Sequence, residues 1–371
     1  MLYITCSLLL SASQTLWSSM PPRLAGPRSP LVRARNSGAT LRASGTTVSA
    51  SGRIQPARNP MDIPWITDRQ VQEVVSLTDA IESVARSIVR EIEGNAGDIA
   101  KTMTTWGPAS SAHALGAYDG GADLVAFKTW VNTPAGASAM MTLFDMSAGR
   151  ARAVLEAGAL GALRTAAVTG LATRLMSDPS ASELALIGSG RQALRQVEAI
   201  CAVRPIRRVR VWSRSEDRRI GFAAAVRDTL GIDATATATL AEAVDSAPIV
   251  TLITRAVEPF LSRGLLSTGT HLNAVGAILP NNAEFDPALL EESDLTVVDN
   301  LVNAQLASRE LNEYYGADWS AVSTLGDLLT EKAHRPSQPR LTVFKGLGMG
   351  LADLAVAATA LEAITGQGAP A

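Results

Sequence analysis

The stretch LALIGSGRQALRQVEAI, from Leu184 to Ile200, decides the fold. A short apolar run, typical of a strand buried on both faces, ends in a Gly-x-Gly turn and continues into residues with helical spacing. In the motif Gly188-Ser189-Gly190-Arg191-Gln192-Ala193, the first glycine permits the tight turn, the second lets a pyrophosphate approach the backbone, and the alanine lets the helix pack closely on the strand. A plain strand–helix turn is the alternative, but the place of the motif between a strand and a helix favours a dinucleotide site.

The surrounding sequence repeats this strand–helix pattern. Apolar runs at 184–187, 209–212, 249–253, 271–275 and 295–298 alternate with helix-like stretches at 191–203, 215–230, 239–246 and 286–292. Alternation at this spacing indicates a doubly wound parallel sheet with helices on both faces, which is a Rossmann α/β domain.

The flanking segments have a different pattern. Helical spacing at 76–94, with Thr78 as the expected N-cap, is followed by strand-like runs at 124–131 and 138–146 and by an Ala-rich helix at 156–177. A last apolar helix is expected at 350–366. We therefore expect an α+β domain into which the Rossmann domain is inserted, with boundaries at 61–172, 173–325 and 326–371.

Residues 1–60 form a separate tract. They hold seven arginines and no Lys, Asp or Glu, and they are rich in Pro, Ser and Gly without periodicity, so they are expected to be a disordered extension. Two interpretations remain open: a transit peptide, or an upstream extension of the reading frame of a protein that starts at Met61.

Composition narrows the class of protein. The formal net charge is −2, and because the first 60 residues are basic, the remainder is strongly acidic, which argues against nucleic acid as a partner. Neither of the two cysteines, Cys6 and Cys201, has a CxxC neighbour or a histidine at ligand spacing, so no zinc site is indicated and a reducing, cytoplasmic setting is expected. No apolar run is long enough for a membrane span.

The end of the second strand of the Rossmann pattern bears on the cofactor. An NAD enzyme usually places Asp or Glu there for the ribose 2′-hydroxyl, whereas this chain has Ser213, Arg214 and Ser215. Hydroxyls and a guanidinium would bind the 2′-phosphate of NADP, and a carboxylate would repel it. NADP is therefore the expected cofactor and NAD the less favoured one, with Glu216 and Asp217 expected to cap the next helix.

Four segments in order, GALRTAAVTGLATRLMS, ALIGSGRQA, HLNAVGAILPNNAEFDPALL and VFKGLGMGLADLAVA, resemble the ornithine cyclodeaminase/mu-crystallin family. The resemblance extends from Met61 to Gly366. It implies a homodimer whose substrate-binding and dimerisation domain surrounds the Rossmann domain. It also implies NAD(P)-dependent hydride chemistry on an amino acid or on the imine derived from it.

The resemblance assigns roles to particular residues. Lys128 matches the family lysine that contacts the substrate carboxylate, and Arg164 matches the arginine beside substrate and cofactor. A solvent-facing strand lysine and a helix-surface arginine are the structural alternatives. The resemblance also implies a cofactor-contacting edge beneath the nicotinamide, made of Thr254, Asn273, Val275 and Gly276.

The chain also departs from the family pattern. Ile278 stands where cyclodeaminases carry a catalytic aspartate, Asn282 where a nearby lysine is found, Thr104 where an arginine helps to hold the carboxylate, and Gly346 where a serine occurs. The missing aspartate leaves no obvious acid/base group for cyclisation. His113 could donate a proton to an imine nitrogen, although a hydrogen-bonded structural histidine is an equal alternative, and His271 is expected to be structural.

These residues predict an NADPH-dependent reductase of an amino-acid-derived imine or ketimine. The second hypothesis is an ornithine cyclodeaminase that forms proline and ammonia with NAD and uses another acid/base group, for which His113 is the candidate. The third is a non-catalytic protein that binds NADP or a small ligand, which would bind cofactor without turnover.

Overall fold

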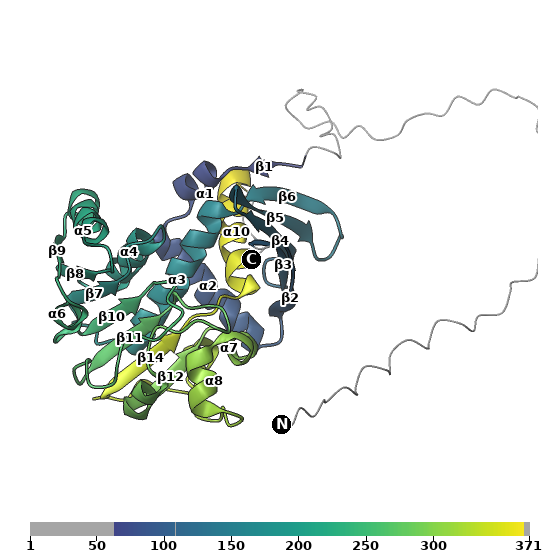
Figure 1. The fold of residues 1–371 in the computed structure, drawn as a ribbon. Helices are drawn as coiled ribbons and strands as arrows, with labels where there is room; N and C mark the ends of the chain where they lie inside the picture. Colours follow the sequence, from purple (N-terminus) through teal and green to yellow (C-terminus); the bar gives the residue numbers. More distant parts are fainter. Residues whose placement is uncertain (1–62, 108, 367–371) are drawn as a thin grey trace, which may run out of the picture. The chain divides into compact units, whose positions relative to one another are not determined.

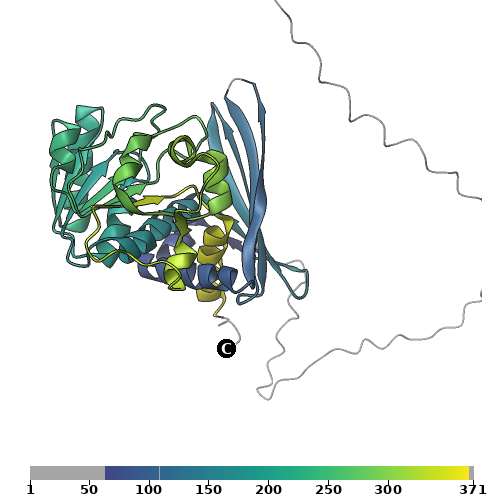
Figure 2. The same cartoon turned by 90° about the horizontal axis from the view of Figure 1, so that it is seen from below.

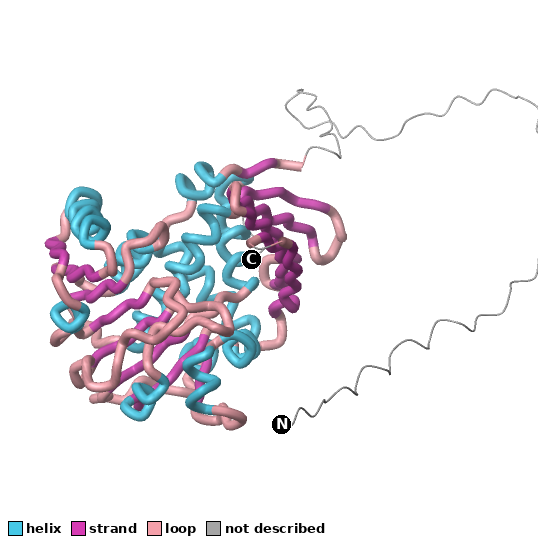
Figure 3. The backbone as a smooth tube through the Cα atoms, viewed as in Figure 1, coloured by secondary structure: helices cyan, strands magenta, loops and turns pink. Residues whose placement is uncertain are grey.

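The computed structural model of the protein describes residues 63–107 and 109–366, and these lie within one compact unit. The disordered extension expected at 1–60 lies outside the described residues. Two β-sheets are separated by a layer of helices, as Figures 1 and 3 show. The expected combination of a parallel Rossmann sheet and an α+β part is confirmed.

The larger sheet has eight parallel strands in the order β13-β12-β14-β11-β10-β7-β8-β9. Its central strands are buried on both faces, as their apolar composition predicts. The strands are β7 (Glu183–Ile187), β8 (Arg208–Trp212), β9 (Asp233–Ala236), β10 (Ile249–Leu252), β11 (Thr270–Ala274), β12 (Ser293–Val298), β13 (Val322–Thr324) and β14 (Leu341–Lys345).

The strand order reverses at β7, since β8 and β9 extend to one side and β10 and β11 to the other. Ligands of doubly wound sheets bind outside the carboxyl ends of the strands at such a reversal. One expectation needs correction. Strand β14, which falls within 326–371, pairs with β11 and β12 inside this sheet, so the chain returns to the other part after Lys345 and not at residue 326.

The smaller sheet has six strands in the order β1-β6-β5-β4-β3-β2, and every neighbouring pair is antiparallel except β1 and β6. Its inner face packs against helices, and Figure 2 shows the other face without a helix over it among the described residues. The strands are β1 (Trp65–Ile66), β2 (Ala96–Trp106), β3 (Ser110–Asp119), β4 (Leu124–Thr133), β5 (Gly136–Asp145) and β6 (Ala151–Glu156).

Three long helices fill the layer between the sheets: α2 (Leu77–Ile92), α3 (Gly158–Met176) and α10 (Gly350–Thr365). Helices α3 and α10 are apolar and small on nearly all sides, which suits helices surrounded by protein. A Cβ at Gly170 of α3 would lie 2.8 Å from Ile81 Cδ1 and 3.2 Å from the carbonyl oxygen of Ala199, so glycine lets α3 pack closely on α2 and α4. The N-cap of α2 is Ser76 rather than the expected Thr78, because the Ser76 hydroxyl accepts the N–H of Asp79.

Helix α1 (Asp68–Val74) follows β1 and packs on α3 and α10. The remaining helices cover the eight-stranded sheet or connect its strands. They are α4 (Ala193–Val203), α5 (Glu216–Leu230), α6 (Leu240–Val244), the 3₁₀ helix η1 (Pro287–Glu292), α7 (Leu301–Ala307), α8 (Arg309–Tyr315) and α9 (Leu325–Leu329). In the part of the chain that the structure describes, no helix combines the length and the apolar character that a bilayer span requires.

Candidate active site

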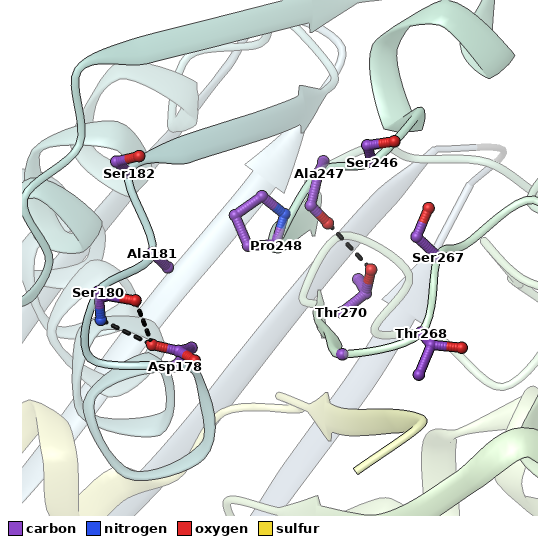
Figure 4. A pocket seen from close by; sticks show the side chains of 11 residues that line it. Asp178, Ser180, Ala181, Ser182, Ser246, Ala247, Pro248, Ser267, Thr268 and Thr270 are labelled. Carbon is purple, nitrogen blue, oxygen red and sulfur yellow. Dashed lines mark hydrogen bonds between the residues drawn. The ribbon is translucent and has the colours of Figure 1, made fainter. Parts of the chain in front are cut away.

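A cavity of about 610 Å³ lies between the carboxyl edge of the eight-stranded sheet and the inner side of strand β4. Its walls bring together Lys128 and Trp130 of β4, Arg164 of α3, Arg191 before α4, and Val275 after β11. A smaller hollow of about 280 Å³ lies at the amino edge of β7, β10 and β11. Figure 4 shows that its side chains are short and mainly hydroxyl-bearing, and that Asp178 accepts hydrogen bonds from Ser180. This lining does not bring together a group of catalytic side chains.

The glycine-rich turn has the geometry that a phosphate site requires. Gly188 has φ +122°, and a Cβ there would lie 2.6 Å from the carbonyl oxygen of Ile253, so this position needs glycine. A Cβ at Gly190 would meet nothing within 4 Å. That space is open on the side from which a pyrophosphate would approach the backbone.

The amino end of α4 lacks a side-chain cap, since Gln192 makes no capping hydrogen bond. By contrast, Asp68 accepts the N–H of Ala159 at the start of α3, and Asp98 accepts that of Leu351 at the start of α10. Unsatisfied N–H groups at a helix start bind anions. The structure therefore fits a nucleotide pyrophosphate at α4, with Arg191 and Gln192 lining the cavity.

The residues after β8 present hydroxyls and a free cation. The Ser213 hydroxyl contacts the Ser189 hydroxyl at 3.0 Å, and Ser215 is the N-cap of α5. Glu216 and Asp217 lie in the first turn of that helix without supplying the cap. Arg214 is exposed and makes no ion pair among the described residues, so its guanidinium is available to a ligand at the end of β8.

Sequence reasoning missed Glu284, a fully buried carboxylate that joins the ends of β10 and β11. Its Oε1 accepts the N–H and the hydroxyl of Thr254 at 2.7 Å, and its Oε2 accepts the N–H groups of Gly276 and Ala277 at 2.8 and 3.0 Å. Thr254 and Gly276 therefore lie at the expected edge of the sheet. A buried carboxylate with this many donors fixes the backbone of both loops.

Asn273 lies elsewhere than expected. Its side chain is fully buried and donates to Thr173 of α3 and to Thr251, while its Oδ1 contacts Nε2 of His271. Asn273 thus holds the sheet to α3 instead of facing the cavity. His271 belongs to the same network, as expected of a structural histidine, and burial lowers the pKa of His271 to about 3.

The opposite wall of the cavity carries a buried ionic cluster. Lys128 Nζ donates to Asp353 Oδ1 at 2.8 Å, and Arg164 Nε donates to the same oxygen at 3.2 Å. Lys128 is 7% exposed and Asp353 is fully buried. The two expected substrate-binding cations therefore lie together, and a carboxylate from α10 that the sequence analysis did not single out connects them.

Two further carboxylates lie near this cluster, the half-buried Asp98 and the buried Asp299. Asp98 of β2 accepts the N–H of Leu351 at 2.6 Å, and Asp299 accepts the N–H groups of Leu347 and Gly348. Burial, with Asp299 and Asp353 nearby, raises the pKa of Asp98 to about 6, and the hydrogen bond from Leu351 opposes this. These carboxylates orient the segment that leads into α10.

His113 does not line the cavity. Its ring stacks on Trp130 with the centroids 4.6 Å apart, and its Nε2 contacts the Ser111 hydroxyl at 2.8 Å. Burial, aided by Lys101, lowers the pKa of His113 and favours the neutral ring. His113 therefore lies against Trp130 outside the cavity lining, which favours the structural alternative over the proton donor.

Strand β2 contributes a cation at a position different from the one expected. Thr104, which replaces the family arginine in the sequence comparison, is exposed and lies outside the cavity lining. An irregularity of register between Ile99 and Thr102 turns Lys101 toward the inner face, where its Nζ lies 5.5 Å from the Trp130 ring centroid. This cation was missed because a bulge cannot be read from the alternation of residues.

The cavity also has an apolar side. Ile278, at the place of the family aspartate, lines it together with Val275, Phe344 and Gly346. Asp353 could have been found in the sequence, because a carboxylate in the mainly apolar stretch 350–361 must have a partner when buried. Lys128 and Arg164, the two cations expected near the substrate, are the partners that it has.

Comparison with known proteins agrees with this geometry. The chain is 32% identical over 225 residues to a Δ1-pyrroline-2-carboxylate reductase of Bacillus cereus, and the match covers 59% of this chain and 68% of the relative. It is 31% identical over 220 residues to the ketimine reductase mu-crystallin of Mus musculus, covering 59% of this chain and 67% of that protein. Both names describe reductases of C=N bonds.

The fold is also similar to solved structures. The Δ1-pyrroline-2-carboxylate reductase of Thermococcus litoralis, solved with NADH and L-proline, matches with a TM-score of 0.77 at 24% identity over 82% of this chain and 98% of that one. A probable ornithine cyclodeaminase from Bordetella pertussis Tohama I matches with a TM-score of 0.76 at 26% identity, over 83% and 100%. The ornithine cyclodeaminase/mu-crystallin family matches residues 65–368, and the chain belongs to this family.

Proposed function

We propose that the protein is an NADPH-dependent reductase that converts an imine or ketimine derived from an amino acid into the amine. The observation that supports this most strongly is the cavity itself, which joins a glycine-rich nucleotide edge to a cation pair. The relatives named as pyrroline-2-carboxylate and ketimine reductases support the same reaction class.

The cation pair suits a substrate carboxylate. Arg164 and Lys128 share one oxygen of Asp353, so each keeps further N–H donors for a ligand. Lys101 lies beside the same wall, over Trp130. Charge-assisted hydrogen bonds of this kind would hold a 2-carboxylate in one orientation and place the adjacent C=N carbon toward the nucleotide edge.

The residues present fit a nicotinamide dinucleotide. Gly188, Gly190 and the uncapped start of α4 would hold the pyrophosphate, and Ser213, Arg214 and Ser215 would lie at the 2′-phosphate. When bound, the reduced cofactor supplies the hydride that the substrate carbon accepts. The preference for NADPH over NADH rests on the free Arg214 and on the absence of a carboxylate at 213–215.

Ile278 favours a reductase over a cyclodeaminase. It lines the cavity with an apolar side chain where a cyclodeaminase would use an aspartate, and His113 lies outside the lining. An imine already contains the C=N bond, so its reduction requires only a hydride and one proton. The site contains groups for that chemistry and, among the described residues, none that would steer ring closure.

We also propose that the protein is a cytoplasmic homodimer. The outer face of the six-stranded sheet exposes Phe127, Val131 and Met140 at 42, 43 and 42%. A contiguous apolar patch of this kind on a sheet marks a protein interface. Light scattering should give twice the chain mass, and Phe127→Glu should give the monomer mass, whereas a monomeric wild type would contradict this proposal.

The function can be tested by mixing the purified protein with NADPH and either Δ1-pyrroline-2-carboxylate or Δ1-piperideine-2-carboxylate. We expect NADPH absorbance at about 340 nm to fall and proline or pipecolate to form. A parallel reaction with ornithine and NAD should release no ammonia. Cofactor binding without turnover on any imine would favour the non-catalytic hypothesis, and ammonia release from ornithine would favour the cyclodeaminase.

A further inference from the structure

The proposed reduction adds a proton to the imine nitrogen, and the cavity must supply it. Six titratable side chains line the cavity among the described residues: Asp68, Lys128, Arg164, Arg191, Arg195 and Asp299. The arginines keep their protons at any relevant pH. Asp68 accepts the N–H of Ala159 with its Oδ1, so its carboxylate holds the start of α3.

Asp299 is a poor proton donor for a geometric reason. Both of its oxygens accept backbone N–H groups, from Asn300, Leu347 and Gly348, at 2.6 to 3.1 Å. A proton on either oxygen would face one of these donors and break its hydrogen bond. Lys128 is the lining residue that remains.

Asp353 is the group that holds Lys128 in place. It is fully buried, its Oδ1 accepts from Lys128 Nζ at 2.8 Å, and its Oδ2 has no hydrogen-bond partner within the described part of the chain. Gly161 of α3 leaves room for the ammonium group, since a Cβ there would lie 3.3 Å from Nζ. The lysine side chain is therefore fixed between β4, α3 and α10.

The charges around Lys128 oppose one another. Arg164 on α3 and Lys101 on β2 disfavour its ammonium form, and Asp353 on α10 favours it. Asp98 on β2 lies near both Asp353 and Asp299. Burial is the largest cause that lowers the pKa of Lys128, and Asp353 limits this decrease. A lysine with a lowered pKa is a stronger acid, but it must still carry its proton when substrate binds.

We propose that Asp353 is the positioning residue of the proton transfer, because it keeps the Lys128 ammonium charged and aimed into the cavity so that Lys128 protonates the imine nitrogen. This inference rests on the proposed function. In the step, one N–H bond of Lys128 breaks and an N–H bond of the product forms. The electron pair for the new C–H bond comes from the reduced nicotinamide, and the neutral Lys128 takes its next proton from water.

The first experiment compares the pH profile of kcat for wild type and Asp353→Asn. We expect the alkaline limb to move down by about one pH unit or more, because the variant loses the charge that favours the ammonium form. Asp119→Asn is the matched control. Asp119 lies on β3 of the six-stranded sheet that also carries Lys128, is 1% exposed, and is paired with Arg90 at 2.6 Å outside the cavity lining. Its alkaline limb should stay at the wild-type pH.

A second measurement needs neither cofactor nor turnover. Acetic anhydride acetylates only neutral lysine, so mass spectrometry of acetylated Lys128 against pH reports its titration. The midpoint should be lower in Asp353→Asn than in wild type and unchanged in Asp119→Asn. Equal midpoints and equal alkaline limbs in wild type and Asp353→Asn would overturn the inference, as would a shift produced by Asp299→Asn instead.

Lys128→Arg separates proton donation from carboxylate binding. Arginine keeps the positive charge but does not release a proton. We expect the affinity for pyrrole-2-carboxylate, a planar stable analogue, to stay within about threefold, while kcat falls about 100-fold or more. Unchanged kcat would contradict the inference. A wild type that reduces no imine would instead refute the proposed function, while the acetylation midpoints would still test the coupling of Asp353 to Lys128.

Discussion

The two walls of the cavity are built in different ways. The nucleotide edge is made of backbone: a glycine turn at Gly188, an uncapped helix start at α4, and strand ends held by Glu284. The substrate wall is made of charged side chains, Lys128, Arg164 and Asp353, from three elements far apart in the chain. This difference means that the first wall is most sensitive to changes of backbone shape, and the second to the loss of a charged side chain.

The largest expected effect is on the substrate wall. Lys128→Met should lower kcat/KM for the imine about 10³-fold, because it removes a proton donor and a carboxylate ligand together. NADPH affinity, measured by fluorescence titration, should stay within about threefold. The exposed Lys332→Met is the control and should leave both quantities unchanged. Equal losses of NADPH affinity and of turnover would show that the two walls are not separate.

The next effect is on the nucleotide edge, where two neighbouring glycines should behave differently. Gly188→Ala should lower the free energy of unfolding by about 2–3 kcal/mol, because of its positive φ and the nearby carbonyl of Ile253. Gly190→Ala should unfold at the wild-type denaturant concentration, since its Cβ meets open space, but should bind NADPH about tenfold more weakly. The same stability loss in both variants would contradict the backbone account.

A smaller effect concerns the choice of cofactor. Arg214→Ala should weaken NADPH binding about 10-fold and leave NADH binding nearly unchanged, since only NADPH carries the 2′-phosphate. Arg208→Ala is the matched control, at the other end of the same strand β8 and exposed. If Arg214→Ala weakened the binding of NADPH and of NADH equally, the preference for NADPH would not come from Arg214.

These differences explain how much could be predicted from the sequence. The nucleotide edge follows from consecutive residues, so the motif at 188–193 and the alternation of strands and helices were predictable from pattern alone. The substrate wall depends on tertiary contacts: Asp353 reaches Lys128 across 225 positions, and Lys101 enters through a bulge in β2. The family resemblance placed Asn273 at the cofactor edge, yet the alternation of strand β11 turns its side chain toward α3.

The smallest predicted effect concerns the buried hydrogen-bond network of His271 and Asn273, which joins the sheet to α3 and belongs to neither wall of the cavity. In the unfolded chain His271 binds a proton below a pH of about 6.5, whereas in the folded protein burial lowers its pKa to about 3. Between these two pH values only the unfolded state is protonated, so the free energy of unfolding falls as the pH falls. The stability of wild type relative to His271→Asn should therefore fall by about 1 kcal/mol from pH 7 to pH 5.5. Chemical denaturation at both pH values measures this, and a constant difference would mean that His271 titrates normally.

The proposed function requires that one cavity binds the substrate carboxylate and presents the adjacent C=N bond to the nicotinamide. The most direct test compares kcat/KM with NADPH for Δ1-pyrroline-2-carboxylate and for Δ1-pyrroline, which lacks the carboxylate. We predict that the carboxylated imine reacts at least about 100-fold faster, and that Arg164→Met removes most of this advantage. Equal rates for the two imines would contradict the account.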